Sequence, residues 1–175
     1  MKIFIAIKID ENIKTLFKNL SHKFATHKNL NWEELDNLHM TIIPPWNYPD
    51  PKEIFDLLSR EFKFKPFLVN FYKIEFGPNK KSPKLLWAVG KPCNECEILR
   101  AKLGNILIDK NIAKVERQFL PHITMARLSD SIDTGSTEPI LEKINWKLLI
   151  NKIEILESTN TNGRKEYRNL FTLYL

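Results

Sequence analysis

The sequence predicts an α+β fold built largely from antiparallel strands. Several short segments alternate apolar and polar residues with a period of two, which is typical of strands, whereas others repeat apolar residues at helical spacing. Strands and helices follow one another in an irregular order, which favours antiparallel pairing over a regular parallel α/β arrangement. With 175 residues, the chain has the usual size of one domain, so we expect residues 1–175 to form a single domain.

Strands are expected wherever the period-two pattern appears between turn-forming residues. Residues 1–9 alternate isoleucines with other side chains, and we expect this strand to lie in the centre of a sheet. A short strand begins at His39, and Pro44 and Pro45 should end it because proline lacks an amide donor. The remaining expected strands are residues 67–76, 85–90, 122–125, 146–156 and 168–175.

Helices are expected where apolar residues recur at spacings of three and four. The first covers residues 10–28, and the second covers residues 51–62 with Pro51 in its first turn. Asn94 should cap a third helix that ends near residue 110, and a short helix is expected at residues 138–143. The predicted buried face of the third helix consists of Ile98, Leu99, Leu103, Ile106 and Leu107.

The composition favours a cytoplasmic protein with an anionic partner. The formal net charge is +6 and the pI is about 9.2, which fits nucleic acid, although lysines on helix faces often serve only solvation. No apolar run approaches the roughly 20 residues that span a bilayer, and residues 1–8 are too short and too charged for a signal peptide. We therefore expect no membrane association.

One short phrase occurs twice, as residues 39–42 (His-Met-Thr-Ile) and as residues 122–125 (His-Ile-Thr-Met), and it uses two of the four histidines. Residues two apart in a strand share a face, so each phrase should present an imidazole beside a hydroxyl and bury its apolar residues. Either phrase alone fits an ordinary strand whose histidine simply makes its hydrogen bonds within the sheet. The duplication favours a functional pair.

Two imidazoles can divide acid and base work on a phosphodiester, because histidine populates both protonation states near neutral pH. Thr41 and Thr124 could donate hydrogen bonds to the non-bridging phosphate oxygens. Arg127 is a candidate anion clamp, but it lies five residues after His122 and so starts on the opposite face. It could reach the site only through a strand end, a β-bulge or its long side chain.

These phrases resemble the signature of the 2H phosphoesterase superfamily, and further stretches resemble its RNA 2′,3′-cyclic phosphodiesterase branch, also called the 2′-5′ RNA ligase family. The resemblance covers most of the chain. The stretches that carry it are Lys2 to Ile7, Asn37 to Ile42, Pro83 to Trp87, Phe119 to Arg127, and Glu157-Ser158 followed by Gly163 and Tyr167.

The resemblance implies a two-lobed, pseudo-twofold α+β fold with an open cleft between largely antiparallel sheets and with helices outside. It implies hydrolysis of an RNA-terminal 2′,3′-cyclic phosphate to a 2′-phosphate, with no metal or other cofactor and with minor 2′-5′ ligation. His39 would donate a proton, and His122 would accept one. It also implies phosphate binding by Thr41, Thr124 and Arg127, and substrate binding by Phe4 and Lys84. We expect a monomer that acts on RNA ends, with tRNA fragments among the candidates.

Other functions stay open. Residues 43–46 (Ile-Pro-Pro-Trp) replace the basic or aromatic continuation common after the first motif, so the substrate could instead be a small cyclic phosphodiester derived from a nucleotide or ADP-ribose. A non-catalytic RNA-end-binding module could use the basic loops at residues 80–84 and 164–168, which could equally be solvated turns. Cys93 and Cys96 form a C-x-x-C that is more typical of two ordinary cysteines at the start of a helix than of a redox or zinc site.

Overall fold

The computed structural model describes residues 1–79, 82–113, 119–129, 140–161 and 164–175. Within them, antiparallel strands form one sheet in the order β7-β4-β5-β6-β3-β1-β8-β9, and β2 pairs with β6 outside this path. This confirms the α+β prediction. The strands are β1 (Lys2–Lys8), β2 (Leu30–Trp32), β3 (His39–Asn47), β4 (Phe67–Gly77), β5 (Leu85–Gly90), β6 (His122–Leu128), β7 (Leu141–Ile150), β8 (Lys152–Thr161) and β9 (Arg164–Tyr174).

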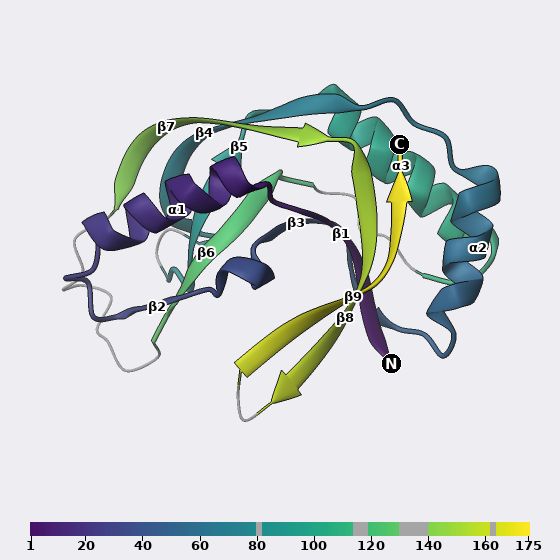
Figure 1. Ribbon diagram of the computed structural model, residues 1–175, viewed down its shortest axis with the longest axis horizontal. Helices are drawn as coiled ribbons and strands as arrows, with labels where there is room; N and C mark the ends of the chain where they lie inside the picture. The colour runs from purple at the N-terminus through teal and green to yellow at the C-terminus, as the bar shows by residue number, and fades with distance from the viewer. Residues whose placement is uncertain (80–81, 114–118, 130–139, 162–163) are drawn as a thin grey trace.

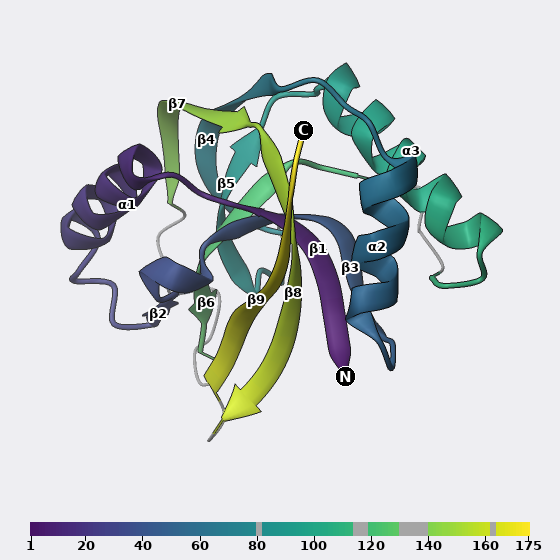
Figure 2. The same ribbon diagram turned by 45° about the vertical axis from the view of Figure 1, so that its right-hand side comes forward.

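The sheet consists of two halves that meet at a narrow junction. One half contains β7, β4, β5 and β6, and the other contains β3, β1, β8 and β9. The only described backbone pair across the junction joins Met40 of β3 to Ile123 of β6. Beyond that pair, β2 occupies the edge of β6, and the β8–β9 hairpin extends away from the rest of the sheet (Figures 1 and 2). Both histidine motifs therefore lie on the innermost strands.

In the described part of the chain, three α-helices cover the sheet, α1 (Glu11–Lys23), α2 (Pro51–Glu61) and α3 (Asn94–Asp109), and a 3-10 helix spans Leu35–Asn37. α1 lies on the side of β7, whereas α2 and α3 lie next to each other on the side of β3 and β9 (Figure 1). The Asp10 side chain caps α1 by accepting a hydrogen bond from the Ile13 amide at 2.8 Å. α1 ends at Lys23, before the predicted residue 28, and Phe24 is its C-cap.

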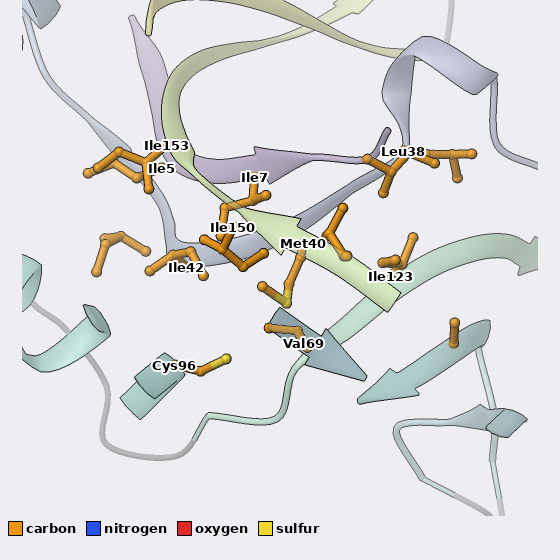
Figure 3. Close-up of a cluster of buried hydrophobic side chains, with 14 of the residues drawn as sticks. Ile5, Ile7, Leu38, Met40, Ile42, Val69, Cys96, Ile123, Ile150 and Ile153 are labelled. Atoms are coloured by element: carbon orange, nitrogen blue, oxygen red, sulfur yellow. The ribbon is translucent and has the colours of Figure 1, made fainter. Parts of the chain in front are cut away.

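The core brings buried side chains of β1, β3, β4, β6, β7 and β8 together with Cys96 of α3 (Figure 3). The isoleucines of β1 face this core, while Phe4 and Ala6 on the opposite face pack with Leu156 and Tyr167. β1 pairs with strands on both sides, which confirms its predicted central position. Met40 and Ile123, the apolar residues of the two motifs, are at most 1% exposed, so burial anchors the strand junction.

The start and the buried face of α3 differ from the prediction. Its N-cap is Cys93 rather than Asn94, and the Cys93 Sγ accepts a hydrogen bond from the Cys96 amide at 3.2 Å. Ile98 is 42% exposed, because it lies on a different face of the helix from the buried stripe. The buried residues of this helix are Cys96, Leu99, Arg100, Leu103, Gly104 and Leu107.

Pro44 and Pro45 do not end their strand, contrary to the prediction, and β3 continues to Asn47. The register against β1 shifts at this point, because the pairs Ile5–Ile43 and Ile3–Trp46 leave one extra residue on β3. Both prolines lie in that irregularity, and β6 does not pair with this part of β3. A strand tolerates proline at such a bulge and along an unpaired edge, where no amide donor is needed.

The expected arrangement of residues 138–156 is also wrong. Residues 138 and 139 lie outside the described residues, and residues 141–143 begin β7 and pair with β4 instead of forming a helix. The predicted single strand 146–156 is divided at Asn151 into β7 and β8. The chain must turn there, because β7 pairs with β4 in one half of the sheet and β8 pairs with β1 in the other.

Candidate active site

The two motif strands lie side by side and present their polar side chains on one face. His39 and Thr41 are half-buried, whereas Met40 and Ile42 are at most 1% exposed, and the second motif shows the same alternation. This confirms the predicted strand pattern. Because Met40 and Ile123 form an antiparallel pair, the residue before Met40 lies opposite the residue after Ile123, and the residue after Met40 lies opposite the residue before Ile123. His39 is therefore next to Thr124, and Thr41 is next to His122.

A β-bulge brings Arg127 to the same face as the second motif. Between the pairs Leu86–Ala126 and Trp87–Thr124, strand β6 has one extra residue, Met125. Met125 and Ala126 are consecutive and both fully buried, so the alternation resets and Arg127 returns to the face of the histidine. The sequence predicted that Arg127 could reach the site only through a β-bulge, a strand end or its long side chain, and the structure shows a β-bulge.

The first motif contains the same bulge. The pairs Ala6–Thr41 and Ile5–Ile43 leave Ile42 as the extra residue on β3, and Ile42 and Ile43 are both 1% exposed. Pro44 consequently occupies the position that Arg127 occupies in the second motif. The two motifs therefore match in the histidine, the threonine and the bulge, but only the second motif is followed by a cationic residue, Arg127.

Side chains and backbone from neighbouring elements hold both bulges. The Ile42 carbonyl accepts a hydrogen bond at 3.1 Å from Nε of Arg100, a buried residue of α3. The Met125 carbonyl accepts a hydrogen bond at 2.9 Å from the Glu33 amide, which follows β2. Because a buried carbonyl needs a partner, these contacts stabilise the irregular backbone that the site requires.

Each histidine ring is oriented by its own backbone. Nδ1 of His39 lies 2.5 Å from the Asn37 carbonyl oxygen, and Nδ1 of His122 lies 2.8 Å from the Leu120 carbonyl oxygen. A carbonyl only accepts hydrogen bonds, so Nδ1 carries the proton in both neutral rings and Nε2 holds the lone pair. Nε2 of each ring is therefore the atom that can accept or return a proton.

Burial favours the neutral form of both imidazoles. It lowers the pKa of His39 from 6.5 to about 4, against the opposing effect of the Asn37 carbonyl, and the positive charges of His122, Lys8 and Arg127 lower it further. Burial also lowers the pKa of His122, against the opposing effect of the Leu120 carbonyl. The coupling to His122 and Arg127 indicates that all three groups share one electrostatic environment.

A cavity of about 170 Å³ opens beside the motifs and reaches the β8–β9 hairpin. At roughly 30 Å³ per water molecule, the cavity has room for several water molecules, and therefore for a phosphate group. His122 is not among the residues that line it, although the other three motif side chains and Arg127 are. The lining residues are Lys2, Phe4, Glu33, Asn37, His39, Thr41, Pro45, Thr124, Arg127, Ser158, Lys165 and Tyr167.

Aromatic rings support both histidines. The ring of Phe4 lies 5.1 Å from that of His39, and the ring of Tyr167 lies 4.9 Å from that of His39. On the other side, the ring of Trp87 lies 4.7 Å from that of His122. Phe4 is 1% exposed, so in this structure it acts mainly as packing beneath the catalytic candidate, and its contact with a base stays a prediction.

Arg127 is held by a residue that the sequence did not single out. Its Nε lies 2.8 Å from the Glu33 carboxylate, whose side chain is 12% exposed. Burial raises the pKa of Tyr167, as does the charge of Glu33, while Arg127 opposes them both electrostatically and through a hydrogen bond. Glu33 carries no motif signal, because it reaches the site only through the pairing of β2 with β6.

Several other predicted residues lie apart from this cavity. Lys84 is exposed just before β5, outside the lining, and its contact with substrate stays a prediction. Lys80 and Lys81 lie outside the described residues. Within the described part of the chain, no group of three or more His, Cys, Asp or Glu side chains could hold a metal ion, and no helix is long and apolar enough to cross a membrane.

Comparison with known proteins identifies the family. The family model described as the 2′-5′ RNA ligase superfamily matches residues 16–162, which is most of the chain. The chain belongs to this superfamily of 2H phosphoesterases. The predicted resemblance is thereby confirmed.

Curated relatives agree with this assignment, and solved structures share the fold. Proteins named RNA 2′,3′-cyclic phosphodiesterase from Methanocaldococcus jannaschii and Archaeoglobus fulgidus are each 28% identical. The first match covers 73% of this chain and 72% of the relative, and the second covers 73% of both. The apo crystal structure of Escherichia coli LigT shares the fold, with a TM-score of 0.77 at 20% identity over 99% of this chain and 96% of LigT. A Thermus thermophilus crystal structure gives a TM-score of 0.79 at 18% identity over 100% of this chain and 98% of that one.

Proposed function

We propose that this protein hydrolyses the 2′,3′-cyclic phosphate at an RNA end and releases a 2′-phosphate. The observation that carries the proposal is the pair of imidazole-hydroxyl motifs joined by the Met40–Ile123 pair, with Arg127 returned to their face by a bulge. The names of the archaeal relatives and the basic charge of the chain support RNA as the substrate. We take residues 1–175 to act as one domain and as a monomer.

The proposed step uses both histidines at once. Nε2 of His122 accepts a proton from water as the water oxygen bonds to phosphorus, and Nε2 of protonated His39 donates its proton to the departing 3′ oxygen. The bond between phosphorus and that oxygen breaks, which leaves the phosphate on the 2′ oxygen. Exchange with solvent then returns both rings to their starting states.

The remaining site residues bind the phosphate. Thr41 and Thr124 donate hydroxyl hydrogen bonds to the two non-bridging oxygens, and the Arg127 guanidinium stabilises the charge that builds on them. A bound phosphate monoanion also raises the pKa of His39, which burial lowers to about 4 in the free protein. Substrate binding therefore favours the proton uptake that a general acid needs. Reverse 2′-5′ ligation would use the same groups.

The proposal is tested with three substrates in the presence of EDTA: an oligoribonucleotide with a 2′,3′-cyclic phosphate end, a mononucleoside 2′,3′-cyclic phosphate, and ADP-ribose cyclic phosphate. We expect the oligonucleotide to be turned over with the highest kcat/KM, and ³¹P NMR should identify a 2′-phosphate product. A 3′-phosphate product would contradict the mechanism. Preference for a small substrate would replace RNA, and tight binding of the oligonucleotide without turnover would indicate an end-binding module.

A further inference from the structure

The cavity continues beyond the motif residues along a wall formed by β1, β8 and β9. Tyr167 of β9 pairs with Ser158 of β8, and Lys165 lies two residues from Tyr167 on the same face of its strand. On β1, Lys2 shares a face with Phe4, whose partner Leu156 is two residues from Ser158. Lys2, Ser158, Lys165 and Tyr167 all line the cavity.

The two lysines on this wall differ electrostatically from Arg127. Arg127 is paired with the Glu33 carboxylate at 2.8 Å, whereas neither Lys2 nor Lys165 has a carboxylate partner among the described residues. Among the described residues that line the cavity, Glu33 is also the only acidic one. Both lysines are exposed, so their charges are available to an anion that enters from solvent.

This wall is stabilised at the point where it approaches the first motif. The Asn37 side-chain amide donates a hydrogen bond of 2.8 Å to the Lys165 carbonyl oxygen, and the Asn37 carbonyl accepts from the His39 ring. The backbone that carries Lys165 is thereby fixed relative to His39. The register also sets the spacing, because Lys2 lies four residues from Ala6, the partner of Thr41, which is about 13 Å along the strand.

An extended lysine side chain spans part of the distance along β1 between Lys2 and Ala6. The remaining distance is comparable to the separation of adjacent phosphates in a nucleic acid strand. We propose that Lys2 and Lys165 form a second phosphate subsite, which binds the phosphodiester that precedes the terminal cyclic phosphate. This inference rests on the proposed function and names its substrate class: an oligonucleotide of at least two nucleotides rather than a mononucleotide.

The test compares a diribonucleotide with a mononucleoside, both ending in a 2′,3′-cyclic phosphate. A third substrate is the diribonucleotide with a neutral methylphosphonate linkage. The variants are Lys2→Gln, Lys165→Gln and their combination, with Lys18→Gln on the exposed face of α1 as the matched control. In the double variant we expect kcat/KM for the charged dinucleotide to fall about tenfold, and its log–log salt dependence to flatten by about 0.7, the value for one phosphate contact on a single strand.

The mononucleotide and the methylphosphonate substrate should change less than twofold in the same variant, and Lys18→Gln should resemble the wild type. An unchanged ratio of dinucleotide to mononucleotide activity in the double variant would overturn the subsite. If no cyclic phosphate is turned over at all, the proposed function fails separately. The subsite is then decided by titration with a dinucleotide ending in a 2′-phosphate: binding must weaken in the double variant, and unchanged binding overturns the inference.

Discussion

The buried ring of His39 should make the stability of the protein depend on pH. Its pKa is about 4 in the folded protein and about 6.5 when the chain unfolds. Between these values the unfolded chain binds a proton that the folded protein does not, so the free energy of unfolding falls as the pH decreases from 6.5 to about 4. At about 1.4 kcal/mol per pH unit the full loss is about 3 kcal/mol, and solvent screening of the half-buried ring reduces it to about 2 kcal/mol.

The assay is urea unfolding followed by tryptophan fluorescence at pH 7.5 and pH 4, for the wild type and for His39→Gln. Glutamine removes the titration, so the stability of the wild type relative to the variant should drop by about 2 kcal/mol between the two pH values. The control is His22→Gln, since His22 is exposed on α1. A difference between wild type and His39→Gln that is the same at both pH values would refute the reasoning.

Three further predictions concern the groups around the phosphate. Gly77→Ala should lower kcat about tenfold or more, because a Cβ at this position would overlap the Trp87 ring that packs on His122. Circular dichroism should show that the variant is folded. Unchanged kinetics would argue against support of His122 by Trp87. Arg127→Ala should reduce kcat about 10²-fold, measured under substrate saturation, and a change confined to KM would contradict its stabilising role in the transition state. A substrate with sulfur in place of the 3′ oxygen has a leaving group that departs without protonation by an acid. It should therefore restore the rate of His39→Ala but not that of His122→Ala. Rescue of His122→Ala alone would reverse the two roles.

The motif strands could be predicted because their signal is local. Alternation of polar and apolar residues fixes which side chains share a face, and both motifs follow it. The resemblance to a known family added the pairing of the two motifs, which periodicity cannot supply. The position of Arg127 could be predicted only as conditional on a bulge, because a bulge depends on partners such as the Glu33 amide.

The wrong predictions also arose from tertiary context. Proline usually ends a strand, but Pro44 and Pro45 lie where β3 bulges and lacks a partner on one side. Residues 141–143 have a weak local pattern, and pairing with β4 makes them a strand. Glu33 and Lys2 were not predicted as cavity residues, and Lys165 was predicted only as part of the basic loop at residues 164–168. All three reach the cavity through strand pairs distant in sequence. Local patterns carry no information about such contacts.

The central claim is that His39 and His122 together perform the acid and base chemistry. The most direct measurement is the single-turnover rate of cyclic phosphate hydrolysis at an oligoribonucleotide end, in EDTA, for His39→Ala, His122→Ala and the control His22→Ala. We predict that each of the first two variants loses about 10² to 10⁴ in rate, while the control keeps the wild-type rate. Wild-type turnover by either His39→Ala or His122→Ala would contradict the two-histidine mechanism.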